Sequence, residues 1–285
     1  MLCAVFEHIS PEIWQQRFAA CRILDAACQP VQPGRMVRAG ERYLHKLPAV
    51  IEPSVNLQVE LLHEDEALIV LNKPAPLPMH AGGRYFRNTL QHVLDTVYAP
   101  QKPRPSHRLD ANTTGVVVVA RTRHFAGQIQ PQFERSEVEK VYLVRVHGHP
   151  PANELVCDAP ISTAAGKLGS RTVDPVSGLP ARTQFRVRER TLDGTALLEA
   201  RPLTGRTNQI RVHLAYLGFP VCGDPAYRTG DALGEIQTLD IDAPPLCLHA
   251  WRISLKHPLH QTRVTFTAPP PVWAETHAPA GLGAA

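Results

Sequence analysis

Two runs of consecutive apolar residues constrain the fold of this chain more than any other feature of its sequence. Leu68–Leu71 and Val116–Val119 are continuous apolar segments, and turn-forming residues bound both of them. A short apolar run without polar alternation is typical of a strand that is covered on both faces. The sequence therefore predicts a sheet with buried central strands. Its 285 residues suffice for one large domain, or for a medium domain and a small one.

Weaker patterns predict further elements after residue 120. Residues 138–148, 184–190 and 196–201 resemble strands, and the stretch 151–182 is expected to be loop with short strands because it is rich in Pro, Gly, Ser and Thr. Residues 207–217 have apolar side chains at a helical spacing and are followed by glycine, so we expect a helix that ends there.

Residues 1–55 are expected to form a small separate unit. Ser10 precedes a proline and an acid, which is typical of a helix start, and Trp14, Phe18 and Cys21 then fall on one helical face. Two turn signals around a short apolar stretch come next. Helical pieces before a short hairpin resemble a degenerate S4-like RNA-binding module. The alternative is a helical extension packed on the main domain.

Composition and charge exclude several classes of protein. No run of about 18 apolar residues exists, which excludes a transmembrane helix, and the first residues lack the features of a signal peptide. The six cysteines include no C-x-x-C pair and the fourteen histidines no H-E-x-x-H motif. No metal site is therefore expected, and a reducing cytoplasm is the expected location. The net charge of +4 is compatible with a polyanionic partner.

Three polar segments are candidates for chemistry, and the first runs from His107 to Gly115, directly before the valine-rich strand. Asp110 lies in this turn, where the following strand holds it rigidly and where it can face a cleft. The alternative is an ordinary aspartate that caps the turn with Thr113 or Thr114.

The second and third candidate segments contain basic and aromatic residues. Arg206 and Arg211 flank a polar first helical turn, and an arginine at the positive end of a helix requires an anion, either a carboxylate or a phosphate. A solvated helix N-terminus is the alternative. Lys140 and Tyr142 share one face of a predicted strand, because side chains alternate along a strand. A tyrosine half-buried in the sheet is the alternative there.

Together these segments resemble the RluA-type RNA pseudouridine synthases over about residues 60–270. The matching segments are Asp65–Pro74, His80–Leu90, His107–Gly115, Lys140–Tyr142, Gly205–Tyr227 and Leu248–Pro258. The sequence departs from the family pattern at Thr114, which replaces a serine, at Asn208, which replaces a histidine, and at Pro76, which replaces a glycine. Pro131 is expected to interrupt the helix that follows the strand at 116–120.

The resemblance implies an α+β fold, the pseudouridine synthase fold. Its mixed, largely antiparallel central sheet is flanked by helices and loops, and a small N-terminal α/β extension precedes it. Three parts of the chain are implied: the unit at residues 1–55, a catalytic domain at residues 56–272 and a flexible tail at residues 273–285.

The resemblance also implies three catalytic residues. Asp110 attacks ribose C1′ or removes a ribose proton, and Arg211 keeps that carboxylate ionised and orients it by bidentate geometry. Tyr142 stacks on the target uracil, and its phenol is a candidate acceptor for the C5 proton.

Six further residues are implied to contact RNA. Arg108 enters the space that the target base vacates when it leaves its stack. Arg206 and Lys73 are expected to contact phosphates, which adds salt-sensitive affinity without reading sequence. His107, Thr114 and Asn208 complete this predicted set.

The implied activity is an isomerisation of uridine to pseudouridine, in which the C1′–N1 bond breaks, the base turns and C5 rejoins the ribose. No cofactor and no metal are required, in agreement with the absence of nucleotide-binding glycine motifs. The expected partner is RNA, ribosomal rather than transfer RNA, and the expected state is a monomer without a membrane partner. The alternatives are a noncatalytic RNA-binding or RNA-folding protein that uses the same cleft, and a glycoside hydrolase for small sugars, which needs a second acid.

Overall fold

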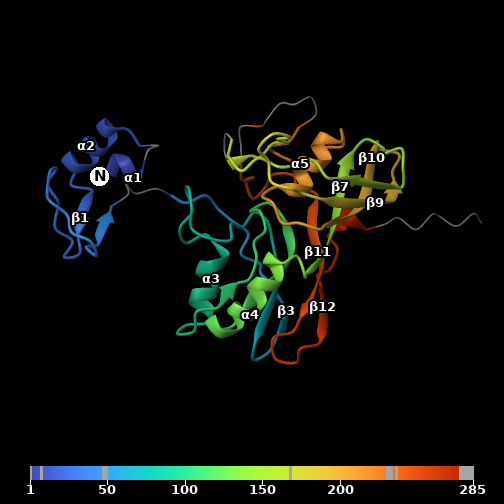
Figure 1. Cartoon of the computed structure of the whole chain (residues 1–285), viewed down its shortest axis with the longest axis horizontal. Helices are drawn as coiled ribbons and strands as arrows, with labels where there is room; N and C mark the ends of the chain where they lie inside the picture. Colours follow the sequence, from blue (N-terminus) through green and yellow to red (C-terminus); the bar gives the residue numbers. More distant parts are fainter. Residues whose placement is uncertain are drawn as a thin grey trace, which may run out of the picture. The chain divides into compact units, whose positions relative to one another are not determined.

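The computed structural model describes residues 2–6, 9–46, 51–166, 169–228, 234 and 237–275. These residues form two compact units, which divide between Ile51 and Glu52 (Figure 1). The boundary predicted from the sequence lies slightly later, after residue 55. Glu52 belongs to the second unit because its carboxylate accepts hydrogen bonds from the backbone N–H groups of residues 86–88, and Val55 is buried in the core of that unit.

In its described residues, the first unit contains two helices and a two-stranded sheet. Its elements are α1 (Leu2–Val5), α2 (Pro11–Ala19), β1 (Ile23–Asp25) and β2 (Tyr43–His45). The predicted helix start is confirmed, since the Ser10 side chain accepts a hydrogen bond from the N–H of Ile13. Trp14 is buried in the core of this unit, whereas Cys21, predicted on the same helical face, lies beyond the end of α2.

The second unit is built on a ten-stranded sheet, and this confirms the mixed, largely antiparallel architecture. The strand order is β3-β4-β6-β11-β7-β10-β9-β8, with β12 beside β11 and β5 beside β6. The strands are β3 (Glu60–Glu64), β4 (Leu68–Lys73), β5 (Arg104–Pro105), β6 (Thr114–Ala120), β7 (Glu139–His147), β8 (Glu154–Cys157), β9 (Thr183–Arg190), β10 (Thr195–Pro202), β11 (Leu248–Lys256) and β12 (Arg263–Thr267). Within the described residues β6 and β11 form the one parallel pair.

The two apolar runs are neighbouring strands, β4 and β6, which pair antiparallel with Leu68 opposite Ala120. Helix α4 (Arg123–Glu134) covers one face of this pair with Ala126 and Ile129. Helix α3 (Leu90–Val97) covers the other face. Both apolar runs are therefore buried from both sides, as the sequence predicted.

The second unit has two lobes, one around β4 and β6 and one around β7 and β10, and the second lobe is layered in a similar way (Figure 1). Helix α5 (Gln209–Tyr216) packs on one face of these strands through Ile210 and Leu214. The short helix η2 (Val272–Ala274) packs on the opposite face with Trp273 and Ala274. Thus η2 occupies the start of the segment that the sequence assigned to a flexible tail, and residues 276–285 of that segment lie outside the described residues.

Two helix predictions need correction. Helix α5 begins at Gln209 rather than at residue 207, because Asn208 adopts a left-handed conformation with φ of 58°. Helix α4 is not interrupted by Pro131 but continues to Glu134. The lost N–H costs one helical hydrogen bond, and the burial of the apolar face of α4 in the core offsets that cost.

Candidate active site

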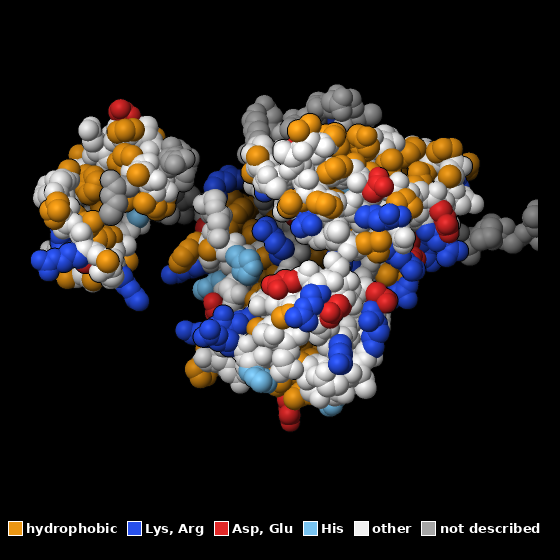
Figure 2. Space-filling model, viewed as in Figure 1, with side chains coloured by type: hydrophobic (Ala, Val, Ile, Leu, Met, Phe, Trp, Pro, Cys, Tyr) orange, Lys and Arg blue, Asp and Glu red, His pale blue; other side chains and the backbone are white. Residues whose placement is uncertain are grey.

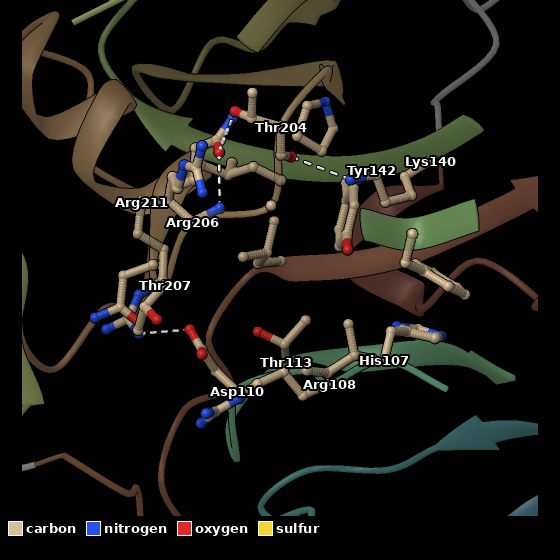
Figure 3. Close-up of a pocket in the computed structure, with 18 of the residues that line it drawn as sticks. His107, Arg108, Asp110, Thr113, Lys140, Tyr142, Thr204, Arg206, Thr207 and Arg211 are labelled. Atoms are coloured by element: carbon tan, nitrogen blue, oxygen red, sulfur yellow. Dashed lines mark hydrogen bonds and ion pairs between the residues drawn. The ribbon is translucent and has the colours of Figure 1, made fainter. Parts of the chain in front are cut away.

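A cleft of about 420 Å³ lies beside the β6–β11 junction of the second unit (Figure 3). Most of its lining comes from three segments: residues 106–113 before β6, the β7 side chains Lys140 and Tyr142, and residues 202–211, which lead into α5. Phe133, Glu134 and Ser136 at the end of α4 and Leu248 of β11 complete it. The structure therefore brings all three polar segments of the sequence together. The same-face placement of Lys140 and Tyr142 is confirmed.

Asp110 lies in a turn that the next strand holds in place. Its backbone carbonyl accepts a hydrogen bond from the N–H of Thr113, and β6 begins at Thr114. Gly115 has a φ of +110°, and a Cβ at this position would lie 2.2 Å from the carbonyl oxygen of Ala250. The close approach of β11 therefore requires glycine, and it anchors the turn that presents Asp110 to the cleft.

Arg211 binds two carboxylates of the site, those of Asp110 and Asp224. Its Nη1 donates to Oδ2 of Asp110 at 2.9 Å, while its Nε and Nη2 donate to the two carboxylate oxygens of Asp224 at 2.7 and 2.8 Å. The bidentate partner is thus Asp224 and not Asp110, which corrects the predicted geometry. Asp110 receives one hydrogen bond from Arg211, so one of its oxygens stays available to a substrate.

Asp224 is a functional residue that sequence reasoning missed. Its side chain is fully buried, and Oδ1 also accepts hydrogen bonds from the N–H groups of Ala226 and Tyr227. The signal was present in the Gly-Asp-Pro sequence at residues 223–225, which matched the family pattern but received no role. Burial opposes the charge on Arg211, yet the hydrogen bonds and charges of Asp224 and Asp110 outweigh it and raise the pKa of Arg211.

The two β7 side chains differ in their ionisation. Burial, and then the negative charge of Asp110, raise the pKa of the Tyr142 phenol well above its usual range, so the phenol stays protonated at physiological pH. Burial lowers the pKa of the Lys140 ammonium to about 8. Lys140 Nζ donates to the carbonyl oxygen of Thr204 at 3.1 Å, in the loop that follows β10 (Figure 3).

Four of the six predicted RNA contacts line the cleft: His107, Arg108, Arg206 and Asn208. Arg108 is exposed and forms no hydrogen bond or ion pair with the described residues. Arg206 donates through Nε to the carbonyl of Pro180, and Asn208 donates to the Tyr227 hydroxyl.

His107 is held within the protein. Its Nε2 accepts a hydrogen bond from the N–H of Val118, and its ring stacks on Phe133 with centroids 4.7 Å apart. Burial, and then the charge of Lys140, lower the pKa of His107 to about 3, so the ring is uncharged in the cleft wall.

The other two predicted RNA contacts are corrected by the structure. Lys73 is fully buried, and its ammonium donates to the carbonyls of Pro74, Leu77 and Ala111, so it cannot reach a phosphate. The Thr114 hydroxyl hydrogen-bonds Nδ1 of His249 at 2.8 Å and does not line the cleft.

Gln209 is a second residue that sequence reasoning missed. Its Oε1 accepts from the Thr204 hydroxyl and from the N–H of Arg206, and its Nε2 donates to the Arg182 carbonyl and the Thr183 hydroxyl. A single side chain therefore fixes the loop that carries one wall of the cleft. The polar run at 207–209 was the signal, but it was interpreted as an anion contact or a solvated helix N-terminus and not as a buried amide.

The arrangement can be compared with known proteins. A sequence model described as RNA pseudouridylate synthase matches residues 67–216, which include Asp110, Tyr142 and Arg211. The chain belongs to the RNA pseudouridylate synthase family. Among curated relatives, the Escherichia coli K12 protein named dual-specificity RNA pseudouridine synthase RluA is 35% identical over 214 residues, which are 73% of this chain and 92% of that protein.

Two human relatives extend the comparison. The protein named pseudouridylate synthase RPUSD2 is 37% identical over 203 residues, and the match covers 70% of this chain but only 37% of the human protein. The solved structure of human RNA pseudouridylate synthase domain containing 4 superposes with a TM-score of 0.60 at 28% identity, over 75% of this chain and 90% of that chain. The pseudouridine synthase fold predicted from the sequence is therefore confirmed.

The described part of the chain contains no metal-binding cluster and no membrane-spanning helix. Among those residues, no group of three or more His, Cys, Asp or Glu side chains is placed to hold a metal ion. Within the same residues, no helix is long and apolar enough to cross a membrane.

Proposed function

We propose that this protein isomerises uridine in RNA to pseudouridine, with Asp110 as the group that acts on the ribose. The observation that carries the proposal is the chain of contacts from Asp224 through Arg211 to Asp110, at a cleft whose opposite wall holds Tyr142. This arrangement fixes one carboxylate and leaves it facing the space that a nucleotide enters. An RNA-binding protein without catalysis gains nothing from a carboxylate that faces a polyanion.

The chemistry needs a carboxylate beside the sugar. When the C1′–N1 bond breaks, positive charge develops on the ribose, and Asp110 either forms a bond to C1′ or removes a ribose proton. Arg211 supports both routes, because its guanidinium orients the carboxylate through one charge-assisted hydrogen bond and leaves the second oxygen uncovered. Tyr142 offers its ring to the uracil, and its protonated phenol cannot act as the first base.

The target nucleotide must leave its helical stack to reach this cleft. Arg108 is exposed at the cleft and free of partners among the described residues, which suits a side chain that fills the vacated space. On the face shown in Figure 2, Lys and Arg side chains lie on both sides of the hollow between the two lobes of the second unit. Phosphate contacts there add affinity without sequence specificity.

The glycoside hydrolase alternative lacks support. Such enzymes need two carboxyl groups that both reach the sugar. Asp224, the other carboxylate bound to Arg211, is fully buried and accepts hydrogen bonds from Arg211 and from two backbone N–H groups. It orients Arg211 and cannot touch a substrate.

For the substrate we propose a structured ribosomal RNA rather than a transfer RNA, modified by a cytoplasmic monomer. The support is the N-terminal unit, whose helices followed by a short two-stranded sheet suit an S4-like module that binds folded RNA. Arg206 and Asn208, which line the cleft, are proposed to contact this RNA.

The test compares pseudouridine maps of total RNA from cells with and without the gene. Complementation should be done with wild type, with Asp110→Asn and with Asp242→Asn, which changes an exposed carboxylate outside the cleft. We expect a site that disappears on deletion and returns with wild type and Asp242→Asn only. Return of the site with Asp110→Asn would show that the assigned residue is wrong, and an unchanged map in every RNA would contradict the proposed activity.

A further inference from the structure

Lys140 is a partly buried cation that lines the cleft and has no counterion among the described residues. It extends from β7 beside Tyr142, and within the described residues it forms no salt bridge. Its ammonium carries three N–H donors, of which the Thr204 carbonyl takes one. Burying a charge without satisfying it is costly. The two remaining donors therefore lack acceptors among the described residues, at the place where the substrate base enters.

The fully buried Lys73 shows what a purely structural role of a lysine looks like in this fold. All three N–H groups of Lys73 are used, at 2.9, 2.9 and 3.1 Å from three carbonyl oxygens, and its side chain does not reach the cleft. Lys140 differs on both counts, because it has free donors and it lines the cleft. The difference indicates that the ammonium of Lys140 binds a ligand in the cleft.

The Thr204 carbonyl places the ammonium. Thr204 is itself fixed by the hydrogen bond of its hydroxyl to Gln209 Oε1 at 2.7 Å, and Gln209 is anchored on Arg182 and Thr183. The amine is thus held by the loop that follows β10, the neighbour of β7 in the sheet. Figure 3 shows Lys140 reaching across above the Tyr142 ring toward this carbonyl.

We propose that Lys140 hydrogen-bonds a carbonyl oxygen of the target uracil and stabilises the negative charge that the base carries while it is detached from the ribose. The inference rests on the proposed function of this cleft. When the C1′–N1 bond breaks, its electron pair stays on the base and spreads over N1, O2 and O4. The pair is then used by C5 to form the new bond to C1′, after which the C5 proton leaves to water and N1 takes up a proton, so that the base is neutral again. Lys140 donates hydrogen bonds throughout and transfers no proton.

The division of charge between the two walls supports this role. Asp110 lies on the wall where positive charge develops on the sugar, and Lys140 lies on the wall of the base-stacking Tyr142. The phenol of Tyr142 is neutral, so it cannot supply the positive charge that the detached base requires. A lysine suits a base that turns, because its ammonium is a point charge on a flexible stem and does not impose the fixed fork of a guanidinium.

The proposed role of Lys140 predicts how kcat changes with pH. Burial lowers the pKa of Lys140 to about 8, so the ammonium is present below that pH and is lost as the pH rises through it. Around Lys140, His107 has its pKa lowered to about 3 and Tyr142 has its pKa raised, so both stay uncharged through this range. The other charged groups that line the cleft are Arg108, Arg206, Arg211, Asp110 and Glu134. The kcat of the wild type should therefore fall above pH 8.

The experiment measures tritium release from [5-³H]uridine-labelled RNA by wild type, Lys140→Met, Lys140→Arg and Lys256→Met. Lys256 is exposed at the far end of β11 and serves as the matched control. Removing a donor that acts on developing charge typically costs about 10²–10³ in kcat, and we expect that loss in Lys140→Met with little change in the Kd for RNA. Lys140→Arg keeps the charge, so it should retain part of the activity and lose the fall above pH 8.

The outcomes separate this inference from the proposed function. If the wild type releases no tritium from any labelled RNA, the proposed function fails first. If the wild type is active and Lys140→Met keeps a kcat within threefold of it, or changes only KM, the inference about Lys140 is wrong. If Lys140→Met does not fold, as a melting curve will show, the pH profiles decide: the same alkaline fall in wild type and Lys140→Arg would overturn the inference.

Discussion

At the scale of single residues, Arg211 is shared between two carboxylates that have different tasks. Asp224 takes the Nε and Nη2 atoms and is itself tied to the backbone of residues 226 and 227, whereas Asp110 takes Nη1 alone. The Tyr227 ring lies under the guanidinium at 5.0 Å from Cζ. The orientation of Asp110 is therefore set through Asp224, a residue that never touches the substrate.

Asp224→Asn tests this chain of contacts. The amide keeps the shape but removes the charge opposite a buried guanidinium, and breaking a buried pair in this way costs about 3–5 kcal/mol of stability. We expect a lower melting temperature and, because Arg211 is then free to shift, a fall in kcat of at least about tenfold with similar affinity for RNA. Single-turnover kinetics and thermal melting, with Asp242→Asn as the control, measure both. A wild-type kcat in a folded Asp224→Asn protein would contradict the positioning role.

Lys73→Met tests the corrected role of Lys73. The carbonyls of Pro74 and Leu77 lose their donor, whereas that of Ala111 keeps the hydrogen bond from the N–H of Leu77. An unsatisfied buried group costs about 1–3 kcal/mol, so urea unfolding should show a stability loss of at least about 2 kcal/mol. The salt dependence of RNA binding should not change. Arg108→Ala, by contrast, should leave stability unchanged and weaken RNA binding. A reduced salt slope in Lys73→Met would restore the original assignment to phosphate.

Which residues meet at the site was largely predictable, but their bonding was not. The motif resemblance led to Asp110, Tyr142 and Arg211, and the structure places all three around one cleft. The burial of Lys73 depends on Ala111, which is 38 residues away in sequence. No local pattern encodes such a distant contact, so a lysine at a strand end was interpreted as exposed.

At the scale of elements, the junction of β6 with β11 decides where the catalytic turn lies. The two strands run parallel here, with His249 opposite Thr114 and Ala250 opposite Gly115. The sequence predicted β6 from its valines, yet the partner strand lies more than a hundred residues away, and only the tertiary fold brings it close. Likewise, α5 begins at Gln209 rather than at the predicted residue 207, because Asn208 takes a left-handed conformation that helical periodicity does not reveal.

Gly115→Ala tests the role of this junction. A left-handed φ strains any other residue by about 1–3 kcal/mol, and here the added Cβ also meets the Ala250 carbonyl oxygen. Gly194→Ala is the matched control, since Gly194 has a φ of +80° but no described heavy atom within 4 Å of the position that its Cβ would take. Urea unfolding should show a clearly larger loss for Gly115→Ala, with a fall in kcat that Gly194→Ala lacks. Equal losses would mean that strand contact does not constrain the turn.

At the scale of the whole molecule, the two units differ in their relation to the known synthases. The family match at residues 67–216 lies entirely within the second unit, and so do all residues that line the cleft. The first unit has its own buried core around Trp14. It contributes six Lys and Arg against four Asp and Glu over residues 1–51, a net charge of +2. This separation suggests that chemistry and part of the RNA affinity belong to different units.

Removal of residues 1–51 tests that separation. If the first unit binds RNA through its positive charges, the shortened chain should lose affinity for RNA. Because each lost phosphate contact contributes about 0.9 to the steepness of log K against log salt, that slope should become less steep by about 2. The kcat at saturating RNA should stay within about threefold of wild type, because the contacts among Asp110, Arg211 and Asp224 are all retained. Filter binding across a salt series and single-turnover rates give the two quantities separately. Loss of affinity at constant kcat supports an RNA-binding module, unchanged affinity removes that role, and a fall in kcat alone would mean that the first unit supports the cleft itself.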